Sequence, residues 1–333
     1  MNDSHAYFET HPELFWDGSN ARYQNAGGYA RIATLFKQIR KEQPGAVLAL
    51  DNGDTIHGTY AAVQTKGEAL IPILNALAFD GMTAHWEFAY GPEQFNRIVE
   101  KLEYPMLAIN CYDKESGELV YPPYQIVERG GLRIGVIGIA ATIVDKTMPP
   151  HFSEGIRFTL GNEELPGHIK HLREAEGVEF IVVFTHLGFP QDVRLASEVD
   201  GIDVLLSGHT HNRLYHPVKV NDTILIQSGS HGSFIGRLDL EVEDGRIINH
   251  LHKLILIDES IELDPEVKSL VDKVLSPHRE MLKEVVGYTD TALNRNRVLE
   301  ATMDNLLLQT LLDASDAKIA FSNGWRYGAP VLQ

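Results

Sequence analysis

The feature that most constrains the fold is a series of short apolar runs, rich in Val, Ile and Leu, separated by helical patterns. The apolar runs are residues 46–51, 104–110, 132–140, 179–186, 202–209 and 223–229. Strands of this composition are usually covered on both faces. Residues 27–43 and 161–177 instead repeat their apolar residues at helical spacing. The alternation predicts a layered α/β architecture.

The pattern changes towards the C-terminal end of the chain. Residues 236–257 alternate polar and apolar positions around Asp244, which predicts a β-hairpin. Residues 258–287 are first acidic and then helical, and we interpret them as a linker helix. Residues 288–333 hold one predicted helix and one predicted strand, too little to bury a core alone. We therefore expect a first domain over residues 1–257 and the truncated beginning of a second α/β domain after the linker.

Both ends of the chain are expected to be incomplete. Asp3 and His5 are expected at the end of a buried first strand, yet only Met1 and Asn2 precede them. The second predicted domain stops after its single helix and strand. The absence of a visible signal peptide therefore does not separate a cytoplasmic from a periplasmic or extracellular location.

Composition excludes several classes of function. The chain carries 29 basic and 46 acidic residues, a net charge of −17, and such a surface repels nucleic acids and anionic membranes. Cys111 is the single cysteine, so an intramolecular disulfide and a cysteine zinc cluster are both excluded. No apolar run reaches the roughly 18 residues of a membrane span. The partners expected are therefore small molecules, and the oligomeric state stays open.

Polar side chains follow several predicted strands at the point where each strand ends. Ligands of open α/β sheets gather at the carboxyl ends of the strands, so we expect these side chains to converge. Any one of the histidines alone would be an ordinary loop residue, but carboxylates and imidazoles together, without thiolates, suit zinc, manganese or iron. The sequence therefore predicts a metal site. The residues concerned are Asp3, His5, Asp51, Asp54, His186, His209 and His211.

These motifs resemble the calcineurin-like metallophosphoesterases, in particular their 5'-nucleotidase branch. The matching segments are residues 2–5, 51–59, 87–91, 185–188, 207–211 and 227–240. The resemblance covers essentially the whole chain and implies a four-layer α/β/β/α domain with two divalent metal ions, manganese or zinc. It implies ligands for each ion, with one aspartate shared as a bridge. For the first ion these are Asp3, His5, Asp54 and His211, and for the second Asp54, His186, His209 and the Asn of a Gly-Asn-His-Glu motif.

The loop GMTAHWEFAYG, residues 81–91, departs from the family's pattern. His85 falls at the position of the metal-binding Asn, where it either binds the second ion or only caps the loop. Trp86 replaces the family's catalytic histidine, and Ala89 replaces the aspartate that pairs with it. An indole N–H does not titrate, so it cannot protonate a leaving oxygen. An enzyme with this loop would favour good leaving groups or use another proton donor, for which His57 is the candidate unless it faces solvent.

The His-Trp-Glu-Phe segment is also similar to that of the SoxB-type sulfohydrolases of the same superfamily, whose leaving group is a sulfur species of low basicity. Residues 322–328, SNGWRYG, resemble SoxB as well, because nucleotidases usually carry a longer Asn-Gly-Gly-Gly-x-Arg loop there. Either resemblance implies Arg326 as an anion-binding residue. Trp325 and Tyr327 either stack on a substrate or pack within the second domain.

Three functions follow from these observations. The leading hypothesis is a two-metal hydrolase of the 5'-nucleotidase family that cleaves phosphate esters such as nucleotides, with His85, His57 and Arg326 at the reacting centre. The close alternative is a SoxB-like sulfohydrolase that releases sulfate from a thiosulfonate. The third hypothesis is a catalytically weakened module that binds metal without turnover.

Overall fold

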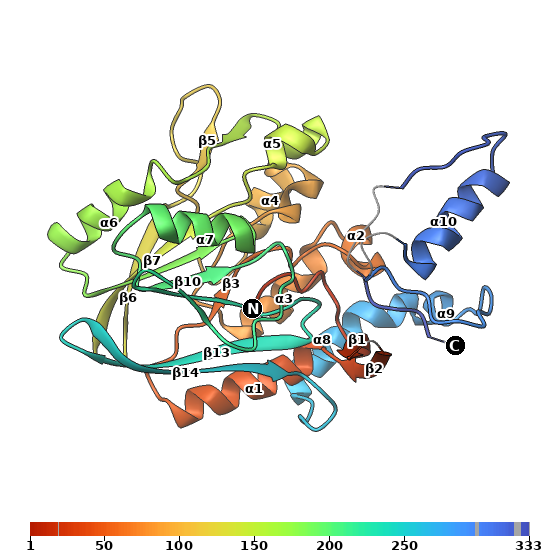
Figure 1. Cartoon of the computed structure of the whole chain (residues 1–333), viewed down its shortest axis with the longest axis horizontal. Coiled ribbons are helices and arrows are strands. Elements are labelled where there is room, and N and C mark those ends of the chain that lie inside the picture. Colours follow the sequence, from red (N-terminus) through yellow and green to blue (C-terminus); the bar gives the residue numbers. More distant parts are fainter. Residues whose placement is uncertain (19, 297–299, 323–327, 333) are drawn as a thin grey trace.

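A six-stranded sheet lies at the centre of the structure, a computed structural model that describes residues 1–18, 20–296, 300–322 and 328–332 (Figure 1). In spatial order its strands are β11 (Val218–Val220), β12 (Thr223–Gln227), β10 (Val204–Ser207), β9 (Phe180–Thr185), β7 (Leu132–Ile139) and β6 (Tyr124–Arg129). The four inner strands run parallel, and each edge strand is antiparallel to its neighbour. The carboxyl ends of the parallel strands therefore meet at one edge of the sheet.

The apolar side chains of these strands alternate between two cores. In β9, Phe180, Val182 and Phe184 enter the core on the inner face of the sheet, whereas Ile181 and Val183 enter the core on its outer face. Successive residues of a strand point to opposite faces, so a strand buried on both faces offers no polar position. This geometry explains the near-continuous apolar runs of the sequence.

A second, smaller layer of strands faces the inner side of this sheet. The layer contains the parallel pair β3 (Leu50–Asp51) and β4 (Gly81–Met82) and the hairpin β13 (Phe234–Glu243) and β14 (Arg246–Leu256). Leu50, Leu238 and Leu240 from this layer pack against the six-stranded sheet. Two further antiparallel pairs lie outside these layers: β1 (His11–Asp17) with β2 (Asn20–Ala26), and β5 (Cys111–Asp113) with β8 (Ile156–Phe158). The hairpin predicted over residues 236–257 is confirmed.

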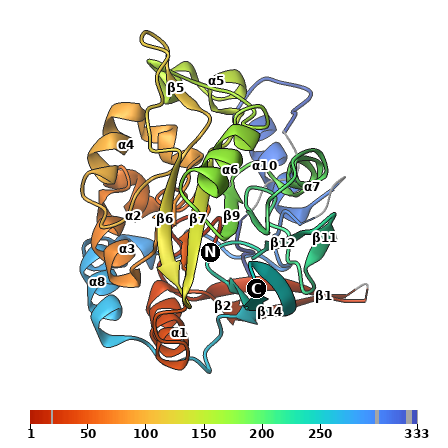
Figure 2. The ribbon, with the colours of Figure 1, turned by 90° about the vertical axis from the view of Figure 1, so that its left-hand side faces the viewer.

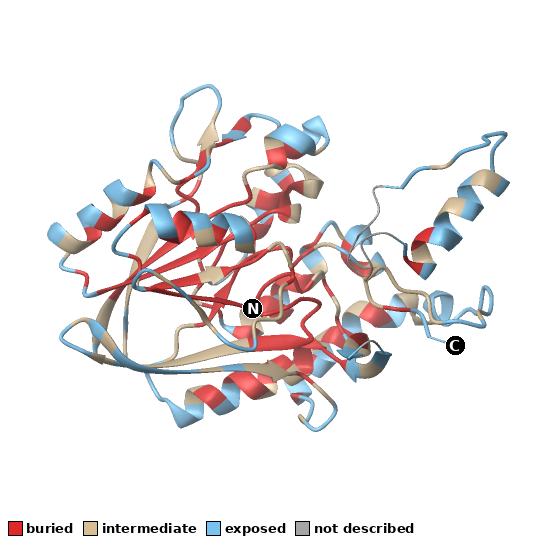
Figure 3. Cartoon of the chain, viewed as in Figure 1, coloured by how far each residue is buried: buried red, intermediate tan, exposed pale blue. Residues whose placement is uncertain are grey.

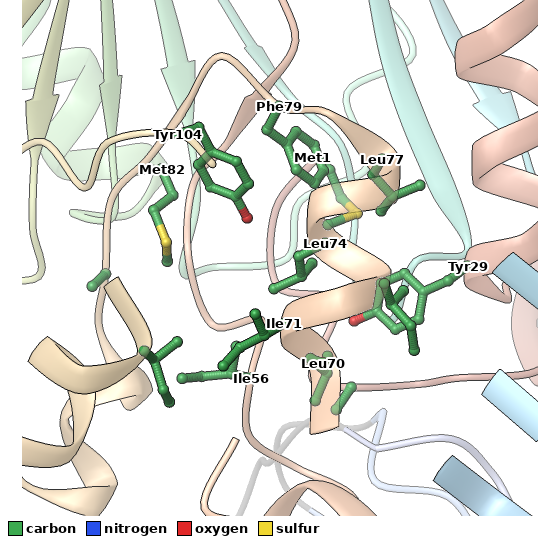
Figure 4. Packing of buried hydrophobic residues seen from close by; sticks show 14 of the residues in the cluster. Met1, Tyr29, Ile56, Leu70, Ile71, Leu74, Leu77, Phe79, Met82 and Tyr104 are labelled. Carbon is green, nitrogen blue, oxygen red and sulfur yellow. The ribbon is translucent and has the colours of Figure 1, made fainter. Parts of the chain in front are cut away.

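Helices cover both outer faces. The α-helices are α1 (Tyr29–Glu42), α2 (Tyr60–Gln64), α3 (Ile71–Leu77), α4 (Pro92–Val99), α5 (Val144–Thr147), α6 (Leu165–Glu174), α7 (Phe189–Glu198), α8 (Pro265–Leu275), α9 (Arg279–Leu282) and α10 (Thr302–Asp313), and the 3₁₀ helices are η1 (Glu68–Leu70), η2 (Trp86–Tyr90), η3 (Pro150–Ser153) and η4 (Ser276–His278). Leu165 and Leu172 of α6 and Leu195 of α7 pack on the outer face of the six-stranded sheet. Helices α1, α3 and α8 cover the other side through a larger cluster, part of which Figure 4 shows around α3. Figure 2 shows these layers from the side, and the predicted four-layer α/β/β/α arrangement is confirmed.

The segment interpreted as a linker helix packs against helices α1 and α3. Its helical part begins only at α8, where Asp264 accepts a hydrogen bond from the backbone N–H of Val267 (3.1 Å) and Pro265 occupies the first turn. Val267 and Val271 are buried in the cluster shared with α1 and α3. The acidic residues that precede Asp264 are not helical. The domain boundaries at residues 257 and 287 stay predictions.

Two predicted strands are shorter than expected. Of residues 46–51 only β3 is a strand, and residues 104–110 pair with β4 through Met106 alone. On one side of Met106, Pro105 has no N–H to donate, and on the other the N–H of Ile109 donates to the carbonyl of Gly138 (3.0 Å). The strand predicted after α10 is not formed within residues 314–322, which pair with no other strand in the described part of the chain; the bridge between Leu293 and Val331 is isolated. Figure 3 shows that α10 is largely exposed whereas the central strands are buried.

Among the helices of the described residues, none is both long enough and apolar enough to span a membrane.

The packing of α8 predicts that its buried face stabilises the first domain. We expect Val267→Ala to lower the free energy of unfolding by about 1–3 kcal/mol, because the side chain is fully buried and its loss leaves a cavity. The matched control is Val286→Ala, because Val286 is 95 % exposed. Its effect should stay within about 0.5 kcal/mol. Urea titrations measure both, and equal effects would show that α8 is not part of this core.

Candidate metal centre

The carboxyl ends of the strands bring the predicted ligands together. His186 follows β9, and His209 and His211 follow β10, while Asp54 follows β3 and His85 follows β4. The first residues of the chain run beside β3, since the N–H of Asn52 donates to the carbonyl of Met1 (2.9 Å) and the N–H of Asp3 donates to that of Gly53 (2.9 Å). This pairing delivers the side chains of Asp3 and His5 to the same edge.

The first group of ligand atoms belongs to Asp3, His5 and His211. The Nε2 atoms of His5 and His211 lie 3.2 Å apart. Asp3 Oδ1 lies 3.1 Å from His211 Nε2 and 4.0 Å from His5 Nε2. All of the ligand atoms in this group lie within 4.8 Å of one another, so one cation could contact all three side chains.

The second group belongs to Asp54, His85, His186 and His209, whose ligand atoms also lie within 4.8 Å of one another. Asp54 Oδ2 is 3.2 Å from His85 Nδ1 and 3.2 Å from His186 Nε2. The same oxygen is 3.8 Å from His5 Nε2 of the first group. Asp54 therefore lies between the two groups, where a bridging carboxylate is expected.

Hydrogen bonds from neighbouring residues orient these ligands. The Nδ1 atom of His186 donates to the carbonyl of Asn52 (2.7 Å), which directs Nε2 towards the centre. Glu87, fully buried, accepts from the backbone N–H groups of His85 (2.7 Å) and Thr55 (2.7 Å). One carboxylate thus ties together the two loops that carry His85 and Asp54.

Left-handed backbone conformations are concentrated at the ligands. Asp3, His5, Asp54, His209 and His211 have φ values of 51°, 48°, 56°, 73° and 56°. Residues other than glycine rarely adopt such angles, and residues that do so cluster at functional sites. Gly53 (φ 89°), directly before Asp54, leaves no room for a side chain, because a Cβ atom there would lie 2.7 Å from the carbonyl oxygen of Thr83.

Protonation in the centre follows from burial and from the two carboxylates. Burial lowers the pKa of His5 to about 3 and of His209 to about 4, with neighbouring histidines adding to the shift. Burial also acts against the charge of His186, but the facing carboxylates of Asp54 and Asp3 raise its pKa to about 10. Burial would raise the pKa of Asp54, yet His85 and His186 hold it well below its usual value. Metal ions bind ionised carboxylates and neutral imidazoles, so a cation in the second group would have to displace the proton of His186.

The residues present fit a pair of divalent cations. Asp3 Oδ1 and His186 Nε2 are buried and accept or donate no hydrogen bond, which is unusual for buried polar atoms. The two atoms lie 3.6 Å apart, one in each ligand group. The donor set contains nitrogen and oxygen atoms only, as zinc and manganese accept.

The variant loop forms η2, whose first residue is Trp86. The indole stacks on the ring of His57, with 4.6 Å between ring centroids and 13° between planes. In a 3₁₀ helix, side chains three residues apart lie on the same face, so Trp86 and Ala89 are neighbours, as the residues of a dyad would be. His57 Nδ1 is buried without a hydrogen-bond partner, and burial lowers the pKa of this imidazole.

A cavity of about 530 Å³ opens beside the centre. Its walls include ligands of both groups, the Trp86–His57 stack and two residues that the sequence analysis missed, Tyr7 and His231. His231 follows β12 as the predicted ligands follow their strands, and that position could have identified it as a site residue. His57 faces this cavity rather than solvent alone.

The predicted site residues have different outcomes. The seven residues predicted to bind metal lie in the two groups described above, and their role as ligands stays a prediction. Asp51 is buried near them and accepts a hydrogen bond from the hydroxyl of Thr55 (2.8 Å). It therefore supports the loop that carries Asp54 and belongs to neither group. Arg326, with Trp325 and Tyr327, lies outside the described residues.

Among proteins of known name, the chain is similar to nucleotide phosphoesterases and 5'-nucleotidases. No protein-family model matches the chain. The chain is 27% identical to the trifunctional nucleotide phosphoesterase YfkN of Bacillus subtilis, over 92% of this chain and 24% of that protein. It is 28% identical to a snake venom 5'-nucleotidase of Naja atra, over 86% of this chain and 59% of the relative. The chain thus spans less than two thirds of the length of each of these relatives.

The solved structures that superpose well on the chain include a sulfate thiohydrolase and a 5'-nucleotidase. The Thermus thermophilus sulfate thiohydrolase SoxB, in complex with glycerol, superposes with a TM-score of 0.83 and 28% identity, covering 87% of this chain and 54% of that one. A 5'-nucleotidase precursor from Thermus thermophilus gives the same TM-score at 23% identity, covering 95% of this chain and 66% of that one, which supports the fold. In its motifs and its four layers the chain resembles the calcineurin-like phosphoesterases, and these relatives support the branch of the 5'-nucleotidases.

Proposed function

We propose that the chain is the catalytic part of a hydrolase that uses two divalent cations to cleave phosphate esters. One observation carries the proposal: Asp54 Oδ2 lies within 3.8 Å of histidine nitrogens from both ligand groups. A carboxylate in that position can bind two cations at once. Paired cations about 3.5–4 Å apart are characteristic of phosphoester hydrolysis without a covalent nucleophile.

The residues that would hold the cations are those predicted from the sequence. Asp3, His5 and His211 would bind the first, His85, His186 and His209 the second, and Asp54 both. We propose manganese or zinc, because both accept mixed carboxylate and imidazole ligands. When bound, the cations supply a water of lowered pKa and stabilise charge on the ester oxygens.

The chain's own residues would supply orientation and the proton. Glu87 holds the loops of Asp54 and His85 in register through three backbone N–H groups. His57 faces the cavity, and its ring is held against the indole of Trp86. We propose that His57 donates the proton to the leaving oxygen, since Trp86 cannot. The indole also forms part of the wall of the cavity.

The relatives support a small phosphoester as the substrate. The Bacillus subtilis protein is named a nucleotide phosphoesterase, and the Naja atra protein a 5'-nucleotidase, so we propose nucleotides among the substrates. We further propose residues 1–257 as the catalytic domain, 258–287 as the connection and 288–333 as the beginning of a substrate-binding domain. Arg326 would bind the anion there.

The second candidate is a SoxB-like release of sulfate from a thiosulfonate. The TM-score of 0.83 to a sulfate thiohydrolase and the His85–Phe88 segment favour it. A third possibility is metal binding without turnover. These alternatives differ in the product formed, and a direct assay separates them.

The first prediction concerns the product. The purified chain loaded with Mn²⁺ should release free phosphate from p-nitrophenyl phosphate and from a nucleoside monophosphate, but no sulfate from an S-sulfonated thiol. Asp54→Asn, which removes the bridging charge, should abolish the release, and Asp222→Asn at a fully exposed position should not. Sulfate without phosphate would establish the sulfohydrolase. Neither product from a metal-loaded chain would establish the binding module.

The second prediction concerns the ligands. Asp54→Asn should lose about two ions per chain because both groups share this carboxylate, whereas His85→Ala should lose about one. Elemental analysis of the metal-loaded variants measures the loss, with Asp222→Asn as the control that keeps the parent's content. If His85→Ala retains the parent's metal content, His85 is a loop residue and not a ligand.

The third prediction concerns the proton donor. His57→Phe keeps an aromatic ring against Trp86 but removes the proton. We expect kcat/KM for nucleoside monophosphates to fall by about 10²–10⁴-fold, while p-nitrophenyl phosphate changes little because its leaving group needs no acid. Metal content should stay at the parent's value.

The Trp86→His, Ala89→Asp double variant should restore much of the lost rate when it is added to His57→Phe. A histidine needs the carboxylate to orient it and to stabilise its charge, so either single change should restore less. An equal loss on alkyl and aryl esters in His57→Phe would contradict proton donation and assign His57 to binding.

A further inference from the structure

A third group of potential ligands lies beside the dinuclear centre and shares no residue with it. The group consists of His11, Glu13 and His231, whose ligand atoms lie within 4.8 Å of one another. Their side chains are 9%, 5% and 5% exposed. Glu13 Oε2 is 3.6 Å from His231 Nδ1 and 3.8 Å from His11 Nε2. The three side chains thus converge on one buried point.

Separate parts of the fold place these residues. His11 and Glu13 alternate on β1, so both side chains leave the strand on the same side. His231 lies between β12 and β13, where its backbone N–H donates to the carbonyl of Asp3 (2.7 Å). Its φ of 58° is left-handed, like that of five ligands of the dinuclear centre. The fold therefore holds His231 in the same strained manner as the predicted ligands.

Close packing also fixes the ring of His11. A Cβ atom on Gly27 would lie 2.7 Å from His11 Cε1, so a glycine is required for this approach. The ring of Tyr7 packs against both His11 and His231, at 4.4 Å and 4.5 Å between centroids. The two imidazoles, whose ring centroids lie 5.8 Å apart, are therefore both held in place by one tyrosine.

We propose that His11, Glu13 and His231 bind a third divalent cation, zinc. Two imidazoles with one carboxylate form a common three-ligand set for zinc, which leaves a fourth position open. With bonds of about 2.1 Å and tetrahedral angles, ligand atoms are roughly 3.4 Å apart. The observed 3.6 Å and 3.8 Å from Glu13 Oε2 are close to this value.

The contacts of Glu13 make Oε2, which accepts a single hydrogen bond, the oxygen that would face the cation. Oε1 accepts from Arg213 (2.6 Å) and from the backbone N–H of Leu14 (3.1 Å). Oε2 accepts from the hydroxyl of Ser233 (2.7 Å), whose oxygen lies 3.1 Å from His11 Nε2. Because the hydroxyl of Ser233 donates its proton to Glu13, His11 Nε2 must be the donor in its hydrogen bond with the Ser233 oxygen. Zinc would displace that imidazole proton, and the hydroxyl could turn away.

One atom of the group is left without a partner. His231 Nδ1 is buried and makes no hydrogen bond, although the great majority of buried polar atoms are paired. Burial would raise the pKa of Glu13, but His11, His231 and Arg213 together hold it below its usual value. The carboxylate is thus ionised, as a ligand must be. A cation between Glu13 Oε2 and His231 Nδ1 would give the imidazole nitrogen a partner and would balance the charge of the carboxylate.

The position of the group suggests what the fourth ligand would be. His231 and Tyr7 line the cavity beside the dinuclear centre, and the rings of His231 and His211 have centroids 5.7 Å apart. An oxygen of an anionic substrate in that cavity is the class of ligand that could complete the coordination. The third cation would add positive charge next to the first metal group.

Metal counting in a background without the dinuclear centre tests the proposal. Asp54→Asn chain is stripped with a chelator, reloaded with Zn²⁺ alone, dialysed and analysed for zinc per chain. We expect about one ion in Asp54→Asn and none after His11→Gln is added. His250→Gln, at an exposed histidine, is the matched control and should keep the ion. Reloading with Co²⁺ should give a visible absorption band that His11→Gln removes.

The difference made by His11→Gln is decisive whatever the state of the dinuclear centre. If Asp54→Asn holds no zinc, or if His11→Gln leaves the zinc content unchanged, the third site does not exist. Circular dichroism checks that each variant is folded, and His231→Gln replaces His11→Gln if the latter is not. Loss of turnover in Asp54→Asn with its third zinc intact would separate this proposal from the proposed function.

Discussion

The centre depends on the interaction of one buried carboxylate, that of Asp54, with imidazoles of both ligand groups. A buried carboxylate is strongly destabilising unless charges or hydrogen bonds compensate it. Here one oxygen faces His85 and His186, and the other accepts the backbone N–H of Trp86 (2.8 Å). The loops after β3 and β4 must therefore meet in one arrangement only.

The strained backbone of the ligands follows from the same requirement. A parallel sheet brings its strand ends to one edge, but the side chains of regular strands point above and below the sheet and not beyond its edge. A left-handed residue in the loop that follows a strand turns the chain and aims the side chain at the edge. Asp54, His209 and His211 use this device. Each costs on the order of 1–3 kcal/mol, which the buried contacts of β3, β9 and β10 offset.

Much of the fold and of the centre could be predicted because both depend on local patterns. The apolar runs that become β7, β9, β10 and β12 and the polar residues at their ends are visible in the sequence. What could not be predicted depends on tertiary pairing. The hairpin β1–β2 has no clear apolar alternation, so the sequence did not predict it. The cluster of His11 and Glu13 with His231 becomes visible only in the folded structure. The short pairing of residues 104–110 depends on β4, far away in the sequence. α8 looked like a linker because its apolar stripe has no partner until α1 and α3 are in place.

Charge gives the last constraint on what the cavity can bind. The chain has a net charge of −17, and no lysine or arginine is among the described residues that line the cavity. The long-range field therefore repels an anionic ester, and physiological salt weakens that repulsion beyond about 8 Å. At contact distance the balance is reversed, because cations held by buried histidines and carboxylates are screened much less than surface charges. Recognition of an anion must then be short-ranged and must depend on the cations, so the described residues act chiefly by deciding how many cations the cavity holds and where they lie.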